Sequence, residues 1–254
     1  MIELHSHILP NIDDGPSTIS QFLEMANLAV SLGITHIFAT PHHMNGKYEN
    51  RKESILMNVS YYNRLIQNEG LPLMIYPGQE LRIHLDIFNS FKKDEILTLG
   101  NKGKYLLLEL PSFEVPNYTY EVVYELLLKG ITPIIVHPER NKELYEEPNL
   151  IVKLIQAGAL TQLTAGSILG HFGKKVKSFS KKLLEHHLVH FISSDAHNNS
   201  SRSFFLQDAY EAITNEFGFK YTFYFRENTE LLFIGQSVQV EEPIRIKGKI
   251  FGLF

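Results

Sequence analysis

The sequence predicts a single α/β domain in which parallel strands form a distorted, seven-stranded (β/α)7 barrel of the TIM type. Three observations support this prediction. Short apolar runs alternate with longer segments of helical periodicity. No Pro/Gly/Ser-rich linker or change of composition divides the 254 residues. The first apolar run is followed by His-Ser-His, whereas an open doubly wound sheet usually has a Gly-rich phosphate loop at that point.

Seven segments are expected to be strands, because each is a short apolar run bounded by turn-forming residues. They are residues 2–5, 34–40, 73–77, 105–110, 132–136, 160–163 and 190–193. Parallel strands need crossover connections, so helices are expected between them.

The first helix is expected between the first two strands, where apolar residues recur at helical spacing from Ile19 to Val30. Thr18 and Gln21 match a capping box before it, and Gly33 follows its end. Further helices are expected over residues 120–129, 144–157 and 174–187, the first two of which are followed by glycine.

Composition limits the possible functions. The formal net charge is −4 and the sequence contains no long basic block, so a nucleic-acid partner is not expected. The chain has no cysteine, which excludes disulfides, thiolate zinc sites and a cysteine nucleophile. The N-terminus does not resemble a signal peptide and no apolar run approaches the roughly 18 residues of a spanning helix. A cytoplasmic protein is therefore expected.

The strongest local signal for chemistry is His5-Ser6-His7, with Pro10 and Asp14 behind it. Two histidines two positions apart at the end of a strand point in the same direction, as a divalent metal site requires. A pair of surface histidines without function is the alternative interpretation of this motif alone.

Other predicted strands also end in metal-ligand residue types, namely His42-His43, Glu80, Glu109, His137 and Asp195-Ala196-His197. In a barrel these side chains would surround one mouth and form a multinuclear metal site. Singly, Glu109 could be a buried paired carboxylate, His137 a core histidine and Asp195 a helix cap. These alternatives do not explain why all the groups fall at the same end.

Several residues are expected to have structural roles only. Most of the remaining histidines lack clustered partners, and His43 is left open. Residues 166–174 resemble a phosphate-binding loop, but Ile168 and Lys175 stand where that motif needs other residues, so it is not a Walker motif. The histidines assigned structural roles are His36, His84, His171, His186, His187 and His190.

These motifs together resemble the PHP (polymerase and histidinol phosphatase) superfamily, and the spacing holds from end to end. Within it, the chain is similar to the manganese-dependent bacterial tyrosine phosphatases of the CpsB/CapC type. The motifs that carry the resemblance are His5-Ser6-His7-Ile8-Leu9-Pro10, Asp13-Asp14-Gly15, Ala39-Thr40-Pro41-His42-His43, Pro77-Gly78-Gln79-Glu80, His137-Pro138-Glu139-Arg140-Asn141 and Ser194-Asp195-Ala196-His197-Asn198.

The resemblance implies the PHP fold over residues 1–254, with three divalent ions, expected to be Mn²⁺, although iron, zinc or magnesium could be loaded instead. It implies that His5, His7 and Asp195 hold the first ion, that Glu80 bridges it to a second held by Glu109 and His137, and that Asp14, His42 and His197 hold the third. Asp14 and Glu109 stand where relatives often have histidine, which favours the tyrosine phosphatase branch and a harder ion. Arg140 and Arg202 match the family's phosphate-binding arginines and, with Asp14, are the candidate catalytic residues.

The implied reaction is the hydrolysis of phosphotyrosine by a metal-activated hydroxide, without a phosphoenzyme. The implied partner is a membrane-associated bacterial tyrosine kinase linked to capsule or exopolysaccharide synthesis. Alternatives are a small-molecule phosphatase of the histidinol phosphate kind and a non-catalytic, metal-stabilised regulatory module. A PHP phosphoesterase acting on nucleic acid is disfavoured by the acidic charge.

The last residues, 244–254, combine lysines with large apolar side chains. They are too few to span a membrane. They are expected either to contact their own barrel or a second copy in a homo-oligomer, or to form a tail that docks on a kinase complex.

Overall fold

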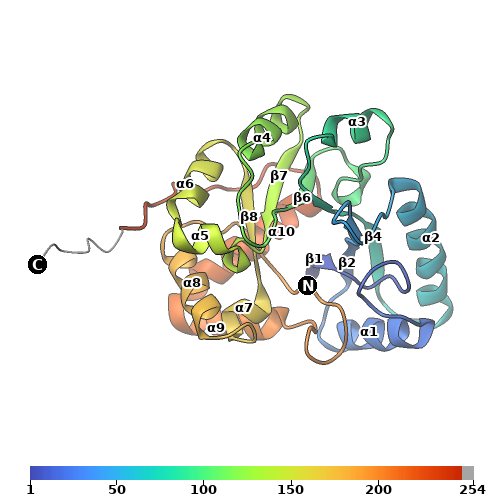
Figure 1. The fold of residues 1–254 in the computed structure, drawn as a ribbon. Helices are drawn as coiled ribbons and strands as arrows, with labels where there is room; N and C mark the ends of the chain where they lie inside the picture. Colours follow the sequence, from blue (N-terminus) through green and yellow to red (C-terminus); the bar gives the residue numbers. More distant parts are fainter. Residues whose placement is uncertain (248–254) are drawn as a thin grey trace, which may run out of the picture.

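Parallel strands form the centre of the fold in the computed structural model, which describes residues 1–247 (Figure 1). One sheet has three strands in the order β1 (Ile2–Ser6), β2 (His36–Ala39), β4 (Met74–Pro77). The other has six strands in the order β3 (His42–His43), β5 (Glu80–Arg82), β6 (Tyr105–Glu109), β7 (Thr132–Val136), β8 (Leu160–Thr164), β9 (Phe191–Ser193). The predicted α/β fold with parallel strands is confirmed.

The described residues contain nine strands rather than the predicted seven. The two additional strands, β3 and β5, follow directly on β2 and β4 and pair with each other, with His42 opposite Glu80. The chain bends before each of them. Pro41 cannot donate to a ladder, and a Cβ on Gly78 would come within 2.9 Å of Thr40 Cγ2. The bends carry the chain from one sheet to the other.

The two sheets approach each other beside β1 and β9. The Asp195 amide donates to His5 O over 2.9 Å, and the His7 amide donates to Ala196 O over 2.8 Å. A continuous closed ladder of strands is not present within residues 1–247.

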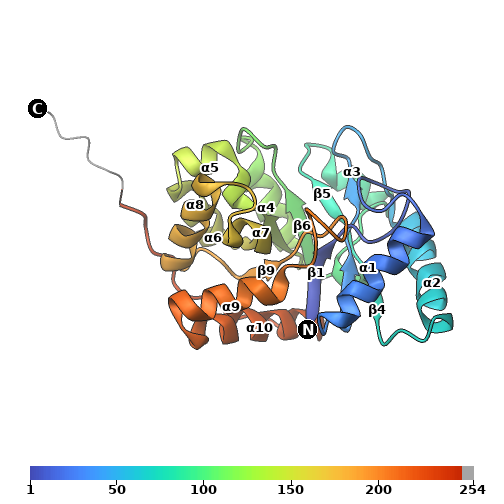
Figure 2. The same cartoon turned by 90° about the horizontal axis from the view of Figure 1, so that it is seen from below.

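Helices cover the outer faces of both sheets (Figures 1 and 2). α1 (Ile19–Ser31) begins at Thr18, whose side chain accepts from the Gln21 amide, as the capping pattern predicts. Beside α1 lies α2 (Lys52–Asn68). The remaining helices are α3 (Ile87–Lys92), α4 (Thr119–Leu128), α5 (Lys142–Glu146), α6 (Asn149–Gln156), α7 (Ala165–Leu169), α8 (Lys174–Glu185), α9 (Leu206–Phe217) and α10 (Phe219–Phe233), with short 3₁₀ turns at η1 (Leu99–Asn101) and η2 (Pro138–Arg140).

The prediction of one helix over residues 144–157 is wrong. The structure has two helices there, α5 and α6, separated at Glu147 and Pro148. Proline has no N–H and its ring clashes with the preceding turn, so a helix cannot run through this position without a break.

An apolar interior supports the strand ends. Leu4, Phe38, Leu107, Ile134 and Phe191 come from five different strands and belong to one buried cluster. The inner faces of the two sheets therefore enclose a common core. Two further buried clusters lie between the sheets and the surrounding helices.

Part of the predicted C-terminal tail contacts the domain. Ile246 is buried, and the Asn149 side chain hydrogen-bonds to both its N–H and its carbonyl oxygen. Residues 248–254 of the tail lie outside the described residues. Across residues 1–247, no helix has the length and apolar character needed to cross a bilayer.

Candidate metal centre

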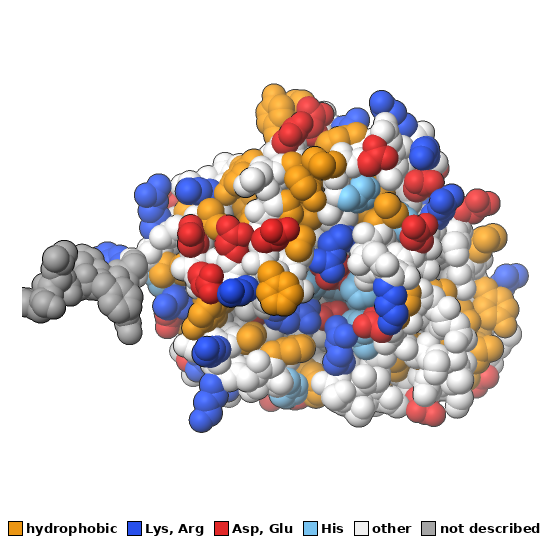
Figure 3. Space-filling view, in the orientation of Figure 1, with side chains coloured by type: hydrophobic (Ala, Val, Ile, Leu, Met, Phe, Trp, Pro, Cys, Tyr) orange, Lys and Arg blue, Asp and Glu red, His pale blue; other side chains and the backbone are white. Residues whose placement is uncertain are grey.

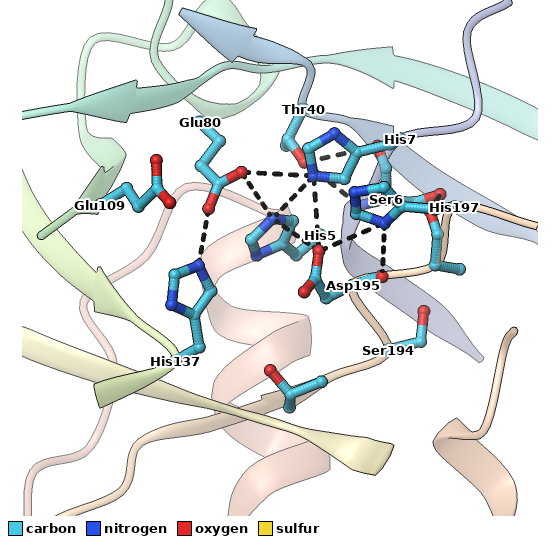
Figure 4. A network of polar contacts seen from close by, with 12 residues as sticks. His5, Ser6, His7, Thr40, Glu80, Glu109, His137, Ser194, Asp195 and His197 are labelled. Carbon is cyan, nitrogen blue, oxygen red and sulfur yellow. Dashed lines mark hydrogen bonds and ion pairs between the residues drawn. The ribbon is translucent and has the colours of Figure 1, made fainter. Parts of the chain in front are cut away.

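Seven of the nine predicted ligand residues are drawn together in Figure 4, and the other two, Asp14 and His42, contact them. All nine lie in or after β1, β6, β7 and β9, or in the segments that follow β2 and β4. Three groups of donor atoms can be distinguished, in each of which the atoms lie within 4.8 Å of one another. The groups are His5, His7 and Glu80; His42, Glu80 and Glu109; and His7, Asp14, His42 and His197. Glu80, His7 and His42 each belong to two groups, so the three groups form one continuous cluster.

Asp195 and His137 belong to none of these groups but contact them. Asp195 Oδ1 lies 3.5 Å from His5 Nε2 and 3.4 Å from His7 Nε2. His137 Nε2 lies 2.8 Å from Glu80 Oε1. Both residues have a left-handed backbone, with φ of 54° at Asp195 and 37° at His137. Non-glycine residues rarely adopt this conformation, and it is enriched at functional sites.

The orientations of His5 and His7 are fixed by partners behind them. His7 Nδ1 lies 2.6 Å from Asp13 Oδ2, and His5 Nδ1 lies 2.8 Å from Gln162 Oε1. Since each Nδ1 then donates its proton, the Nε2 atom of each neutral ring carries a lone pair. The two Nε2 atoms are only 3.3 Å apart. A cation between them would satisfy both, and carboxylate partners behind histidine are typical of metal sites.

The charges of the cluster also favour a cation. Burial and the negative charge of Glu80 raise the pKa of Glu109 to about 7. Burial alone would lower the pKa of His42, but Glu80 and Asp14 raise it to about 9. The buried atoms Glu109 Oε2 and His197 Nε2 have no hydrogen-bond partner among the described residues. Divalent ions would relieve the repulsion between carboxylates and bind the unpaired atoms, so the donor set fits metal.

Two arginines lie beside the cluster. Arg140 Nη2 and Arg202 Nη2 donate to Asp195 Oδ2 over 2.7 and 3.0 Å. Arg202 Nη1 also lies 3.5 Å from Asp14 Oδ2. A cavity of about 220 Å³ is lined by both arginines, His42, Glu80, Glu109 and Asp195, among others. In Figure 3, histidine and acidic side chains lie in a hollow near the middle of the molecule, between basic side chains.

Three residues near the cluster support it, although no role is predicted for them from the sequence. Asp13 holds His7, Gln162 holds His5, and the buried carboxylate of Glu3 accepts from the amides of His5 and Ser194. Strand periodicity contains a signal for Glu3, because residues 3, 5 and 7 point to the same face. For Gln162 the only signal is a polar residue within an apolar strand.

His43 and residues 166–174 lie outside the three groups. His43 is buried, and burial together with the charge of His84 lowers its pKa to about 4. Residues 166–174 include most of α7, the turn that follows it and the first residue of α8.

Comparisons with known proteins agree with this geometry. Residues 1–233 match the family described as capsular polysaccharide synthesis, CpsB/CapC. The chain is 42% identical over 255 residues to the tyrosine-protein phosphatase YwqE of Bacillus subtilis strain 168, and the match covers all of both chains. It is 32% identical over 245 residues to the tyrosine-protein phosphatase CpsB of Streptococcus agalactiae serotype III, with 94% of this chain and 98% of the relative covered.

A solved structure is also similar. It comes from a crystallographic study of YwqE from Bacillus subtilis and CpsB from Streptococcus pneumoniae, described there as unique metal-dependent tyrosine phosphatases. The TM-score is 0.94 at 41% sequence identity, with 98% of this chain and 100% of that chain covered.

Proposed function

Because this chain belongs to the CpsB/CapC family, we propose that it is a metal-dependent protein-tyrosine phosphatase that acts in capsular polysaccharide synthesis. The observation that carries the proposal is a cluster of nine His, Asp and Glu side chains beside a cavity that five of them line together with Arg140 and Arg202. This combination suits the hydrolysis of a phosphate monoester, whose dianion needs both Lewis acids and planar cationic donors.

His5, His7 and Asp195 would hold a first ion, Glu109 and His137 a second, and Glu80, which contacts both sets, would be shared between them. Asp14, His42 and His197 would hold a third. The position of His42, between Glu80 and Asp14, also lets it contribute to the second ion. The proposed metal is Mn²⁺, since a mixed set of imidazoles and carboxylates suits an ion of intermediate hardness.

When bound, such ions supply positive charge and lower the pKa of coordinated water to near neutrality. The protein residues provide the rest of the site. Arg140 and Arg202 bind the phosphoryl oxygens and orient the group for in-line attack. Their shared partner, the buried Asp195 carboxylate, keeps both guanidinium groups at the cavity while neutralising part of their charge. Asp14, the most exposed of the four carboxylates, fixes Arg202 from the outside.

The proposed hydrolysis needs no nucleophilic side chain. The chain has no cysteine, and phenolate is a good leaving group, so direct attack by water suffices. The proposed fold is a distorted barrel of the PHP type, in which β9 pairs with β8 and the segment after β9 hydrogen-bonds to the end of β1. The proposed substrates are phosphotyrosine proteins, including a membrane-associated tyrosine kinase. The proposed location is the cytoplasm, where such a kinase finds ATP.

Activity assays on three substrates test the proposal. The manganese-loaded protein is given a phosphotyrosine peptide, the matched phosphoserine peptide and histidinol phosphate. The expected result is turnover of the phosphotyrosine peptide with a kcat/KM well above the other two. A preference for histidinol phosphate would favour a small-molecule phosphatase, and no turnover of any substrate with the metals bound would favour a regulatory module.

A further inference from the structure

The turn between α7 and α8 has an unusual glycine pattern. Gly170 and Gly173 have φ of 97° and 92°, values that glycine adopts readily and other residues rarely do. The Gly173 amide donates to Gly170 O over 3.0 Å and closes the turn. The glycines that resemble a phosphate-binding loop in sequence therefore build a tight reversal, and Phe172 lies within it.

This turn places the Phe172 ring against Arg140. The guanidinium carbon of Arg140 lies 5.1 Å from the ring centroid, within the range of a cation–π contact. Asp195 binds the Nη2 end of the same guanidinium. Arg140 Nε is buried and has no hydrogen-bond partner among the described residues. The orientation of Arg140 therefore depends on one carboxylate and one aromatic face.

The Phe172 ring packs against the backbone of α7. A Cβ on Gly166 would come within 3.3 Å of Phe172 Cε2, so glycine lets the ring lie close to the helix backbone. The neighbouring His171 is also fixed, since its amide donates to Gly166 O and its ring contacts Phe205 edge-on at 4.4 Å.

α7 also fixes the residue next to Arg140. Glu139 Oε1 accepts from the Thr164 amide over 3.0 Å and from Ser167 Oγ over 2.7 Å. α7 thus contacts Glu139 of the η2 turn directly, and it contacts Arg140 through the ring of Phe172, which lies against Gly166. This arrangement is a rigid support for the side chain of Arg140.

We propose that Phe172 is a positioning residue that holds the Arg140 guanidinium in the orientation that binds the phosphoryl group. The inference rests on the proposed phosphate-binding role of Arg140. Without the ring, Arg140 has more accessible rotamers and loses more conformational entropy on binding phosphate. Phe172 is not a member of the three donor groups, so its effect falls on phosphate binding rather than on metal binding.

Phe172→Leu removes the ring face and keeps an apolar side chain, whereas Phe172→Tyr keeps the ring. The assays are KM and kcat for a phosphotyrosine peptide, competitive inhibition by inorganic phosphate, and metal content. Phe172→Leu should raise both KM and the phosphate inhibition constant about fivefold, as loss of one cation–π contact implies. The metal content of Phe172→Leu should equal that of the parent. Phe172→Tyr should have the KM and the phosphate inhibition constant of the parent. The control is Phe223→Leu on the exposed side of α10.

The same substitution in an Arg140→Met background decides the mechanism, because a positioning residue has nothing to position there. Phe172→Leu should then leave phosphate inhibition unchanged. An equal effect in both backgrounds, or an effect that follows a loss of metal, would overturn the inference. If Phe172→Leu leaves KM and the phosphate inhibition constant unchanged while Arg140→Met weakens phosphate inhibition, the inference fails but the proposed function stands. If Arg140→Met is itself silent, the proposed role of Arg140 fails and the inference with it.

Discussion

Arg140 and Arg202 donate hydrogen bonds to the same atom, Oδ2 of Asp195, over 2.7 and 3.0 Å. They come from distant parts of the chain, one from the turn after β7 and one from the loop after β9. A single buried carboxylate therefore sets the relative position of two planar donor groups at the cavity. The buried Nε atoms of both arginines have no hydrogen-bond partner among the described residues.

Arg140→Lys should lower kcat/KM for a phosphotyrosine peptide by about tenfold or more, because a point charge replaces a planar fork that can bind both Asp195 and phosphate. Steady-state kinetics and metal analysis check this, and the metal content should not change. Arg64→Lys, on the exposed face of α2, is the matched control. A kcat/KM equal to that of the parent would remove Arg140 from the phosphate site.

Asp13→Ala should weaken metal binding by about ten- to a hundredfold, because His7 loses the carboxylate that fixes its ring 2.6 Å away. Metal retained after dialysis against increasing chelator concentrations measures the effect. Asp208→Asn, at an exposed position of α9, serves as the control. Asp13→Ala with the metal retention of the parent would show that His7 needs no orienting partner.

Removal of metal should abolish turnover and also lower the melting temperature. Without cations, the buried carboxylates of Glu80 and Glu109 repel each other, and the binding free energy of the ions no longer stabilises the folded state. Adding back Mn²⁺ should restore both quantities more fully than Mg²⁺, which prefers oxygen ligands only. Full activity of a protein shown by mass spectrometry to be metal-free would contradict the proposed chemistry.

The positions of several candidate ligands could be predicted because short apolar runs bounded by turn residues locate the strands. His5 and Glu109 lie at strand ends and Glu80 lies three residues past the end of β4, and parallel strands bring their carboxyl ends to one side of the molecule. Pro148 in the sequence indicates a helix break, but the apolar periodicity continues across it and favours a single helix.

Other features leave no local signal. β3 has two residues and β5 three, too few for any periodicity to be recognised. The partnership of Gln162 with His5 spans 157 positions and exists only after β8 and β1 have folded. The contact between Phe172 and Arg140 likewise depends on packing between two turns. Such contacts are determined by tertiary structure and not by residue spacing.

His190 should make the stability of the fold dependent on pH. Burial lowers its pKa to about 3, and its Nδ1 accepts from the Thr161 amide, so the folded protein holds it neutral. In the unfolded chain its pKa is about 6.5, so the unfolded state binds more protons and stability falls as the pH drops below that value. His190→Asn keeps an acceptor for Thr161 and does not titrate.

Between pH 7.5 and pH 5, the parent should therefore lose about 2 kcal/mol more unfolding free energy than His190→Asn. Urea denaturation of both proteins at the two pH values measures the difference, in which contributions from the metal cluster cancel. Parallel pH dependences of the two proteins would show that the pKa of His190 is the same in the folded and unfolded states.

Two deletions separate the roles proposed for the C-terminal tail. Ile246 is buried and paired with Asn149, and the Ile244 amide donates to His186 O over 2.9 Å, so these residues stabilise their own domain. Deleting residues 244–254 should lower the melting temperature, because it exposes the Ile246 site and leaves the Asn149 side chain unpaired.

Deleting only residues 248–254 keeps those contacts and should leave the melting temperature and the activity on a small phosphotyrosine peptide unchanged. If the tail docks on a kinase complex, this shorter deletion should slow dephosphorylation of the intact kinase, and equal rates with and without residues 248–254 would exclude docking.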